Sequence, residues 1–203
     1  LPGEGSGESL RLQLLPGAAP ERIALAASLL ARLAGQVEFD LALRPADQPD
    51  VAGVAAALVA DWQPLAIAAR GDRSLSDLGA ELTQQIAAQA KRGYFTADLR
   101  HRAPELRETA TPDLAISLAP RGPVPGAALT LTLTDAGAYL DHDPARISPA
   151  QAQRLARALD AGLALPGTTA LRDIPMMDAA ERDDLLIARN ATQTDFRLAC
   201  IHD

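Results

Sequence analysis

The side chains most able to do acid–base chemistry in this sequence of 203 residues are its three histidines. His142 lies between Asp141 and Asp143, where a carboxylate could orient the imidazole as a general base. A turn at the end of a strand uses the same short polar residues, and Pro144 follows them, so the sequence favours a structural role. His101 lies among arginines and indicates a solvated basic surface. No histidine has the HxxxH or HExxH spacing of a metal-binding helix, so we expect no metal site.

The sequence also gives little evidence for a catalytic nucleophile or a phosphate-binding loop. The single cysteine, Cys200, has no second thiol with which to form an internal disulfide or a thiolate metal site. The sequence contains no GxSxG motif and no glycine-rich loop between a strand and a helix. The residue types and spacings alone therefore define no active site.

Composition excludes several classes of protein. The net charge is −7 and aromatic residues are 3% of the chain, which disfavours a nucleic-acid partner. The longest apolar run, residues 51–60, is too short to span a bilayer, so we expect no membrane segment. The first residues have neither the basic nor the apolar region of a signal peptide, and the sequence does not begin with Met. We therefore expect a piece of a longer protein in a reducing compartment.

Periodicity predicts an α/β fold with a mixed sheet flanked by helices. Serine followed three residues later by a polar side chain predicts helix starts at Ser74 and Ser148. We expect another helix from Asp178, with Leu185 and Leu186 inside. Residues 51–60 are ambiguous, 94–112 are read as a short helix and a loop, and 119–128 as a crossing loop. The remaining expected elements are strands at residues 10–14, 37–43, 62–69, 113–118, 129–134 and 139–142, and helices at 20–34, 74–93 and 148–163.

The C-terminal tail carries the most specific pattern. Residues 171–203 read LRDIPMMDAAERDDLLIARNATQTDFRLACIHD. This resembles the junction between condensation and adenylation domains of nonribosomal peptide synthetases, in order and in spacing. The matching positions are Leu171, Asp173, Pro175, Glu181, Arg182, Leu185, Leu186, Asn190, Ala191, Thr192, Cys200, Ile201 and His202.

The preceding residues resemble the C-terminal lobe of a condensation domain more weakly. Residues 28–43 are similar to a family helix and strand, and 57–67 to the strand segment "f.vNt.PLr". Asp61 replaces the usual Asn there, and Ala66 the usual Arg. Residues 92–106 resemble the "hQ.y.feDL" region, although Lys91-Arg92 replaces its His-Gln pair. Residues 122–137 resemble the "GPv.dLtl.v.d" segment that passes to the other lobe, without its usual acid.

The resemblance implies a fold and a set of domains. It implies one chloramphenicol-acetyltransferase-like lobe of the CoA-dependent acyltransferase kind. We expect a flexible N-terminal segment at residues 1–9, the lobe at 10–170, and a C-terminal helix and linker toward an adenylation domain at 171–203.

The resemblance also implies which residues take part. The family signature HHxxxDG belongs to the other lobe and is absent here, so no catalytic residue is expected in this chain. One tunnel wall is expected to include Asp61, Trp62, Pro64 and Leu65. A segment bridging the lobes is expected at Arg121, Gly122, Pro123 and Val124.

The implied reaction is amide formation between two substrates held as thioesters on phosphopantetheine arms of carrier proteins. Partners would be the N-terminal lobe, the upstream and downstream carrier proteins and the adenylation domain, in the cytoplasm of a bacterium. No cofactor would bind directly, and this lobe alone would be inactive. One alternative is a non-catalytic, condensation-like module that recruits a carrier protein or a tailoring enzyme. Another is a free-standing acyltransferase of an unrelated type, for which His142 is the best candidate base.

Overall fold

Alternating side chains build six strands that form one mixed sheet. A computed structural model describes residues 10–14, 19–47, 58–93, 97, 103 and 112–192. The strand order in the sheet is β1-β6-β5-β4-β2-β3. All six predicted strands are confirmed, with their ends within two residues of the predicted ones. Their bounds are β1 Leu10–Leu14, β2 Glu38–Arg44, β3 Gln63–Ala68, β4 Leu114–Ser117, β5 Leu129–Thr134 and β6 Gly137–His142.

The centre of the sheet is parallel and its edges are antiparallel. Strand β4 pairs in parallel with both β2 and β5, while β2–β3, β5–β6 and β1–β6 pair antiparallel. Strands β5 and β6 form a hairpin, since Thr134 pairs with Gly137 across the turn. Gly137 has φ 148°, a conformation that favours glycine.

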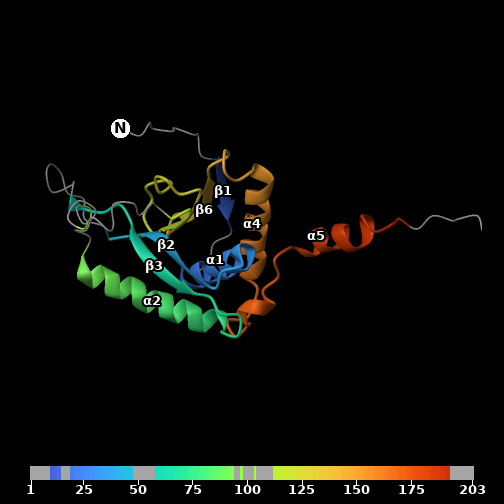
Figure 1. Cartoon of the computed structure of the whole chain (residues 1–203), viewed down its shortest axis with the longest axis horizontal. Helices are drawn as coiled ribbons and strands as arrows, with labels where there is room; N and C mark the ends of the chain where they lie inside the picture. Colours follow the sequence, from blue (N-terminus) through green and yellow to red (C-terminus); the bar gives the residue numbers. More distant parts are fainter. Residues whose placement is uncertain are drawn as a thin grey trace, which may run out of the picture.

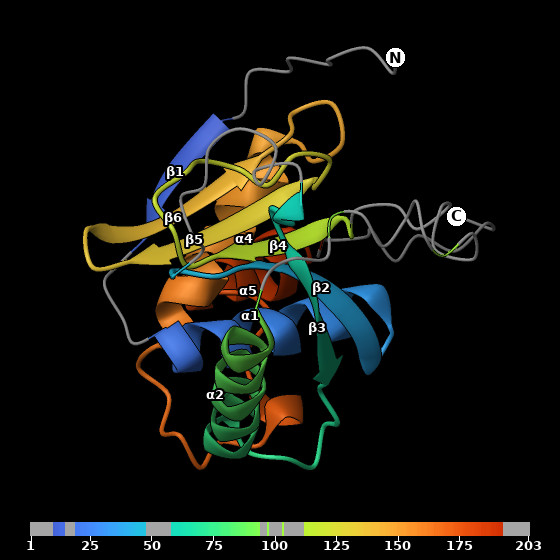
Figure 2. The ribbon, with the colours of Figure 1, turned by 90° about the vertical axis from the view of Figure 1, so that its left-hand side faces the viewer.

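Three long helices cover one face of the sheet (Figures 1 and 2). They are α1 Ala19–Ala34, α2 Leu75–Arg92 and α4 Pro149–Gly162, and α1 contacts both of the others. The predicted N-terminal caps form. Ser74 Oγ accepts the Asp77 N–H at 3.1 Å, and Ser148 with Gln151 makes a full capping box.

The core between helices and sheet is aliphatic. Leucine, isoleucine and alanine side chains of the three helices and of β2 to β6 fill it. Helix α4 approaches α1 so closely that a Cβ on Gly162 would lie 2.5 Å from Leu25 Cδ2. A larger residue at this position would therefore force the two helices apart.

The C-terminal segment leaves this core. It comprises the turn η3 Leu171–Asp173, helix α5 Ala179–Asp183 and a π-helical turn, η4 Asp184–Ala188. The expectation that Leu185 and Leu186 lie inside is wrong, because they are 36% and 57% exposed. The cause is that α5 runs off the outer side of α4 (Figure 1), where no described element covers it.

Ion pairs between charged side chains attach α5 to α4. Arg157 pairs with Asp178 at 3.0 Å and Arg154 with Glu181 at 2.5 Å. The backbone N–H of Glu181 lowers the pKa of Asp178 by donating a hydrogen bond to its carboxylate.

Several sequence expectations fall outside the described residues. These are the N-terminal segment 1–9, residues 51–57, most of 94–112, and the tail from 193 onward. Within the described part of the chain, no helix is long and apolar enough to cross a membrane.

Candidate functional site

The two faces of the sheet carry different side chains. In β2, Leu41 and Leu43 point into the aliphatic core under the helices, which we call the helix-side face. Ala42 and Arg44 alternate with them and therefore lie on the opposite, loop-side face. The parallel pairing sets Arg44 beside Ser117 of β4.

Arg44 is the centre of the candidate site. Its side chain is 3% exposed, although it is charged. Its guanidinium donates two hydrogen bonds to the Asp61 carboxylate, Nε to Oδ1 at 3.1 Å and Nη2 to Oδ2 at 2.5 Å. It also donates to the Gly122 carbonyl at 2.7 Å and the Pro123 carbonyl at 3.4 Å. A planar, always-charged donor fork is suited to holding several acceptors at once.

This arginine joins the two segments that the sequence singled out separately. Asp61 belongs to the predicted wall segment, whereas Gly122 and Pro123 belong to the predicted bridging segment. The sequence analysis missed Arg44 because it ended the predicted strand at residue 43, while β2 in fact ends at Arg44. Continuing the alternation of Leu41 and Leu43 by one residue would have put Arg44 on the loop-side face.

Apolar contacts support the same junction. Ala42, Ala115 and Val124 form a small buried cluster on the loop-side face, and Trp62 and Ala127 pack against it. Trp62 of the wall segment therefore packs on the cluster to which Val124 of the bridging segment belongs.

The other predicted residues fall in different places. Pro64 is exposed on the loop-side face, opposite Ala42 in the neighbouring strand. Leu65 points to the helix-side face and is fully buried in the main core, so its side chain reaches no surface of the described chain. Arg121 is exposed at the start of the bridging segment.

Hydrogen bonds also fix the loop at residues 119–128, which contains the bridging segment. Ser117 Oγ donates to the Ala119 carbonyl at 2.7 Å, and the Val124 N–H donates to Thr130 Oγ1 at 3.0 Å. Gly122 and Gly126 have φ of 76° and 86°, which other residues rarely adopt. The segment therefore follows one defined path over the loop-side face.

His142 takes the structural role that its surroundings indicated. The residue ends β6, is 2% exposed, and its Nδ1 lies 3.0 Å from the Ile147 carbonyl oxygen. A carbonyl only accepts, so Nδ1 carries the proton and donates it to this bond. His142 is thus buried and engaged, so it is not an accessible base for the unrelated-acyltransferase alternative. His101 and His202 lie outside the described residues.

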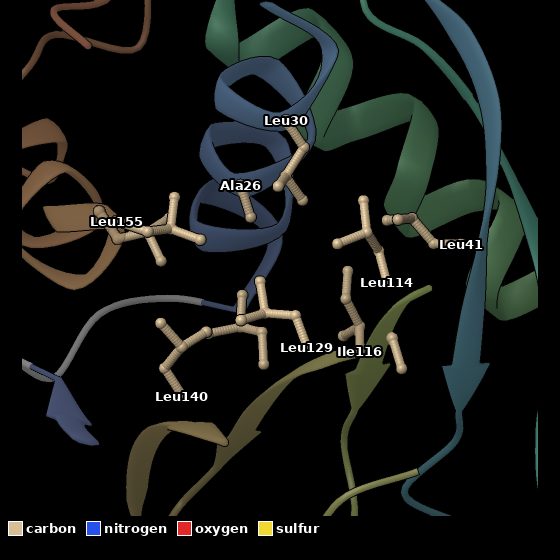
Figure 3. A pocket seen from close by; sticks show the side chains of 11 residues that line it. Ala26, Leu30, Leu41, Leu114, Ile116, Leu129, Leu140 and Leu155 are labelled. Atoms are coloured by element: carbon tan, nitrogen blue, oxygen red, sulfur yellow. The ribbon is translucent and has the colours of Figure 1, made fainter. Parts of the chain in front are cut away.

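The small cavity inside the aliphatic core is not suited to holding a polar ligand. The cavity drawn in Figure 3 lies between α1, α4 and the strands, has a volume of about 10 Å³ and is lined entirely by alanine, leucine and isoleucine. Its walls carry no polar side chain that could orient a ligand. No group of three potential metal-ligating side chains occurs among the residues that the structure describes.

Comparisons with known proteins bear on the fold. No protein-family model matches the sequence, and no curated protein sequence is similar enough to count as a relative. Among solved structures, the chain is similar to the starter condensation domain of the rhizomide synthetase RzmA. The identity is 19%, the TM-score is 0.57, and the match covers 84% of this chain and 49% of that one. The first condensation domain of the CDA synthetase matches with 16% identity, a TM-score of 0.60 and 83% and 48% coverage.

The predicted fold class is confirmed. The chain is an α/β lobe with a mixed sheet flanked by helices, and it shares its fold with condensation domains. It spans about half the length of the structures that it matches.

Proposed function

We propose that this chain is the C-terminal lobe of a condensation domain in a nonribosomal peptide synthetase. The observation that carries the proposal is the fold match, which covers most of this chain and about half of each matched domain. The tail resemblance at residues 171–203 supports assignment to the C-terminal half. The following domain would then be an adenylation domain, in a bacterial, cytoplasmic enzyme.

The proposed reaction joins two substrates carried as phosphopantetheine thioesters. The amine on the downstream carrier attacks the thioester carbonyl carbon on the upstream carrier. A C–N bond forms, the C–S bond breaks, and the proton lost by the amine nitrogen ends on the thiol that is released. Such a reaction gains much of its rate from holding the two reactants in the right geometry. A lobe that shapes the tunnel and docks carriers therefore contributes without supplying a base.

The roles we assign follow the Arg44 junction. Asp61, Trp62 and Pro64 would form part of one tunnel wall, and residues 121–124 would lead toward the N-terminal lobe. Leu65 would support this wall from the core. The carriers bring the phosphopantetheine, and this lobe binds no cofactor directly.

The second candidate function is recruitment without catalysis. It is favoured by the departures from the family pattern at Asp61, Ala66, Lys91-Arg92 and Ala127-Ala128. A condensation-like domain with altered tunnel residues could still bind a carrier protein or a tailoring enzyme.

One assay separates the two functions. The parent protein that contains this chain is supplied with an aminoacyl carrier and an acyl carrier, and amide product is followed by mass spectrometry. The condensation proposal expects product from the parent protein and none from the 203 residues alone. Carrier binding by the parent protein without product would support recruitment, whereas amide formation by the isolated chain would refute the assignment as an inactive lobe.

A further inference from the structure

We propose that Arg44 is a positioning residue, which holds the bridging segment (residues 121–124) in register with the start of β3. The inference deepens the proposed function, since it names the residue that sets the shape of the proposed wall. The hydrogen-bond geometry itself is independent of that function.

Arg44 makes contacts that the fold of the sheet does not require. Its partners Asp61, Gly122 and Pro123 lie 17, 78 and 79 residues away in sequence, and none of them belongs to a strand. The aliphatic core lies on the other face of β2, so Arg44 contributes nothing to it. What the guanidinium does is tie two irregular segments to the end of a central strand.

The geometry couples these two segments to each other. A guanidinium is a rigid plane, so donors that point at Asp61 fix the direction of the donors that point at Gly122 and Pro123. A displacement of Asp61 must therefore turn the plane and stretch the bonds to the bridging segment. The wall segment and the bridging segment move as one unit as long as Arg44 is in place.

Asp61 supplies the charge that lets Arg44 stay buried. The Arg44 side chain is 3% exposed and that of Asp61 is 42% exposed. A buried guanidinium without a carboxylate is unfavourable, because the carbonyl groups of Gly122 and Pro123 solvate the charge but do not neutralise it. Asp61 thus lies at the solvent side of the junction, and its charge determines whether Arg44 stays bonded to the bridging segment.

Trp62 provides a direct reporter of this junction. It is the only tryptophan of the chain and follows Asp61 directly. It packs on the cluster that includes Val124 of the bridging segment. If the two segments separate, the indole gains solvent contact while the helices and the aliphatic core remain folded.

The test compares Arg44→Lys, Arg44→Met and Asp61→Asn in the 203-residue chain, with acrylamide quenching of Trp62 as the measurement. The matched control is Arg70→Met, which removes an exposed ion pair with Glu38 that involves no residue of the junction. Far-UV circular dichroism and thermal unfolding verify that each variant is folded. If Arg44→Met does not fold, Arg44→Lys and Asp61→Asn carry the test.

We expect Arg44→Lys and Arg44→Met to raise the quenching constant about twofold at unchanged helix content, because local opening exposes the indole. Lys keeps the charge but not the planar fork, so it should not rescue the junction. Asp61→Asn should give a smaller rise and Arg70→Met none. An unchanged quenching constant in folded Arg44→Lys, or an equal rise in Arg70→Met, would overturn the proposal.

A kinetic measurement on the parent protein separates this inference from the proposed function. Where the wall guides the reaction, Arg44→Lys should lower kcat about tenfold with little change in thermal stability, because small displacements are costly to orientation. Increased quenching with unchanged amide formation would keep Arg44 as the positioning residue and remove this wall from the reaction. Unchanged quenching would overturn the positioning role whatever the activity.

Discussion

The two faces of the sheet are organised by different forces. On the helix-side face, Leu41, Leu65 and Leu140 are at most 1% exposed and pack by shape alone. On the loop-side face, Ser117 and Thr130 are equally buried, yet they make directional bonds to the loop at residues 119–128. Volume governs the first face, whereas matching of donors to acceptors governs the second. Exchange of one aliphatic residue for another should therefore be tolerated on the helix-side face. Replacement of a hydrogen-bonding side chain by an aliphatic one should not be tolerated on the loop-side face.

The largest expected effect comes from emptying the helix-side face. Leu140→Ala should lower the free energy of unfolding by about 2–5 kcal/mol, because the aliphatic core around it cannot close the cavity fully. Urea unfolding followed by circular dichroism measures this. Leu33→Ala, at a position that is 63% exposed, is the control and should change stability by less than about 0.5 kcal/mol. Equal effects of the two variants would contradict the assignment of the core.

Overfilling the same face should come next in size. Gly162→Ala places a methyl group against Leu25 and should cost about 1–3 kcal/mol through the α1–α4 contact. In a Leu25→Ala background the added methyl should be tolerated, so a double-mutant cycle should show strong coupling. Additive effects would mean that the two helices do not meet as described.

Two threonines on the loop-side face form a matched pair of variants that tests the contribution of the directional bonds. Thr130→Val removes the acceptor of the Val124 N–H and should cost about 1 kcal/mol. Thr132 Oγ1 is buried and has no hydrogen-bond partner among the described residues, so Thr132→Val should be neutral or raise stability by up to about 1 kcal/mol. Thermal unfolding of both variants measures the difference. Equal losses would show that volume, and not bonding, governs this face as well.

The smallest expected effect concerns the tail, which belongs to neither face. The pKa of Asp178 is lowered in the folded chain, chiefly by the Glu181 backbone N–H and also by Arg157. The stabilisation of α5 should therefore be complete above the ordinary pKa of an aspartate and be lost as pH falls through the lowered value. The exchange protection of the Glu181 amide should fall over that acidic range more than that of the Gln151 amide, which donates to the uncharged Ser148 hydroxyl. Equal pH dependence at both amides would contradict the capping role of the carboxylate.

Local pattern predicted the elements well, because alternation and caps are encoded within a few residues. The six strands and the caps at Ser74 and Ser148 follow directly from such patterns. The Arg44 junction could not be predicted in this way, since its partners come from segments far apart in the chain. The only local clue to Arg44 was the alternation of side chains in β2, a strand that ends one residue later than expected.

The prediction for the C-terminal tail was wrong for a related reason. The apolar stretch at Leu185 and Leu186 reads as a buried helical face, and burial needs a partner surface that periodicity does not reveal. Ion pairs at the start of α5 join it to α4, and the two leucines beyond them are exposed. The pattern was therefore correct about helical structure and wrong about burial.

The strand order also has a consequence for how this chain folds during synthesis. Strand β1 is the first along the chain and forms one edge of the sheet, where its partner in the sheet is β6, the last strand in chain order. Contacts between distant segments form slowly, because a long loop must close before any bond is gained. A nascent chain must carry β1 unpaired until residues 137–142 have left the ribosome. Of the six strands in this sheet, the first to be synthesised is thus the last to find its partner in the sheet.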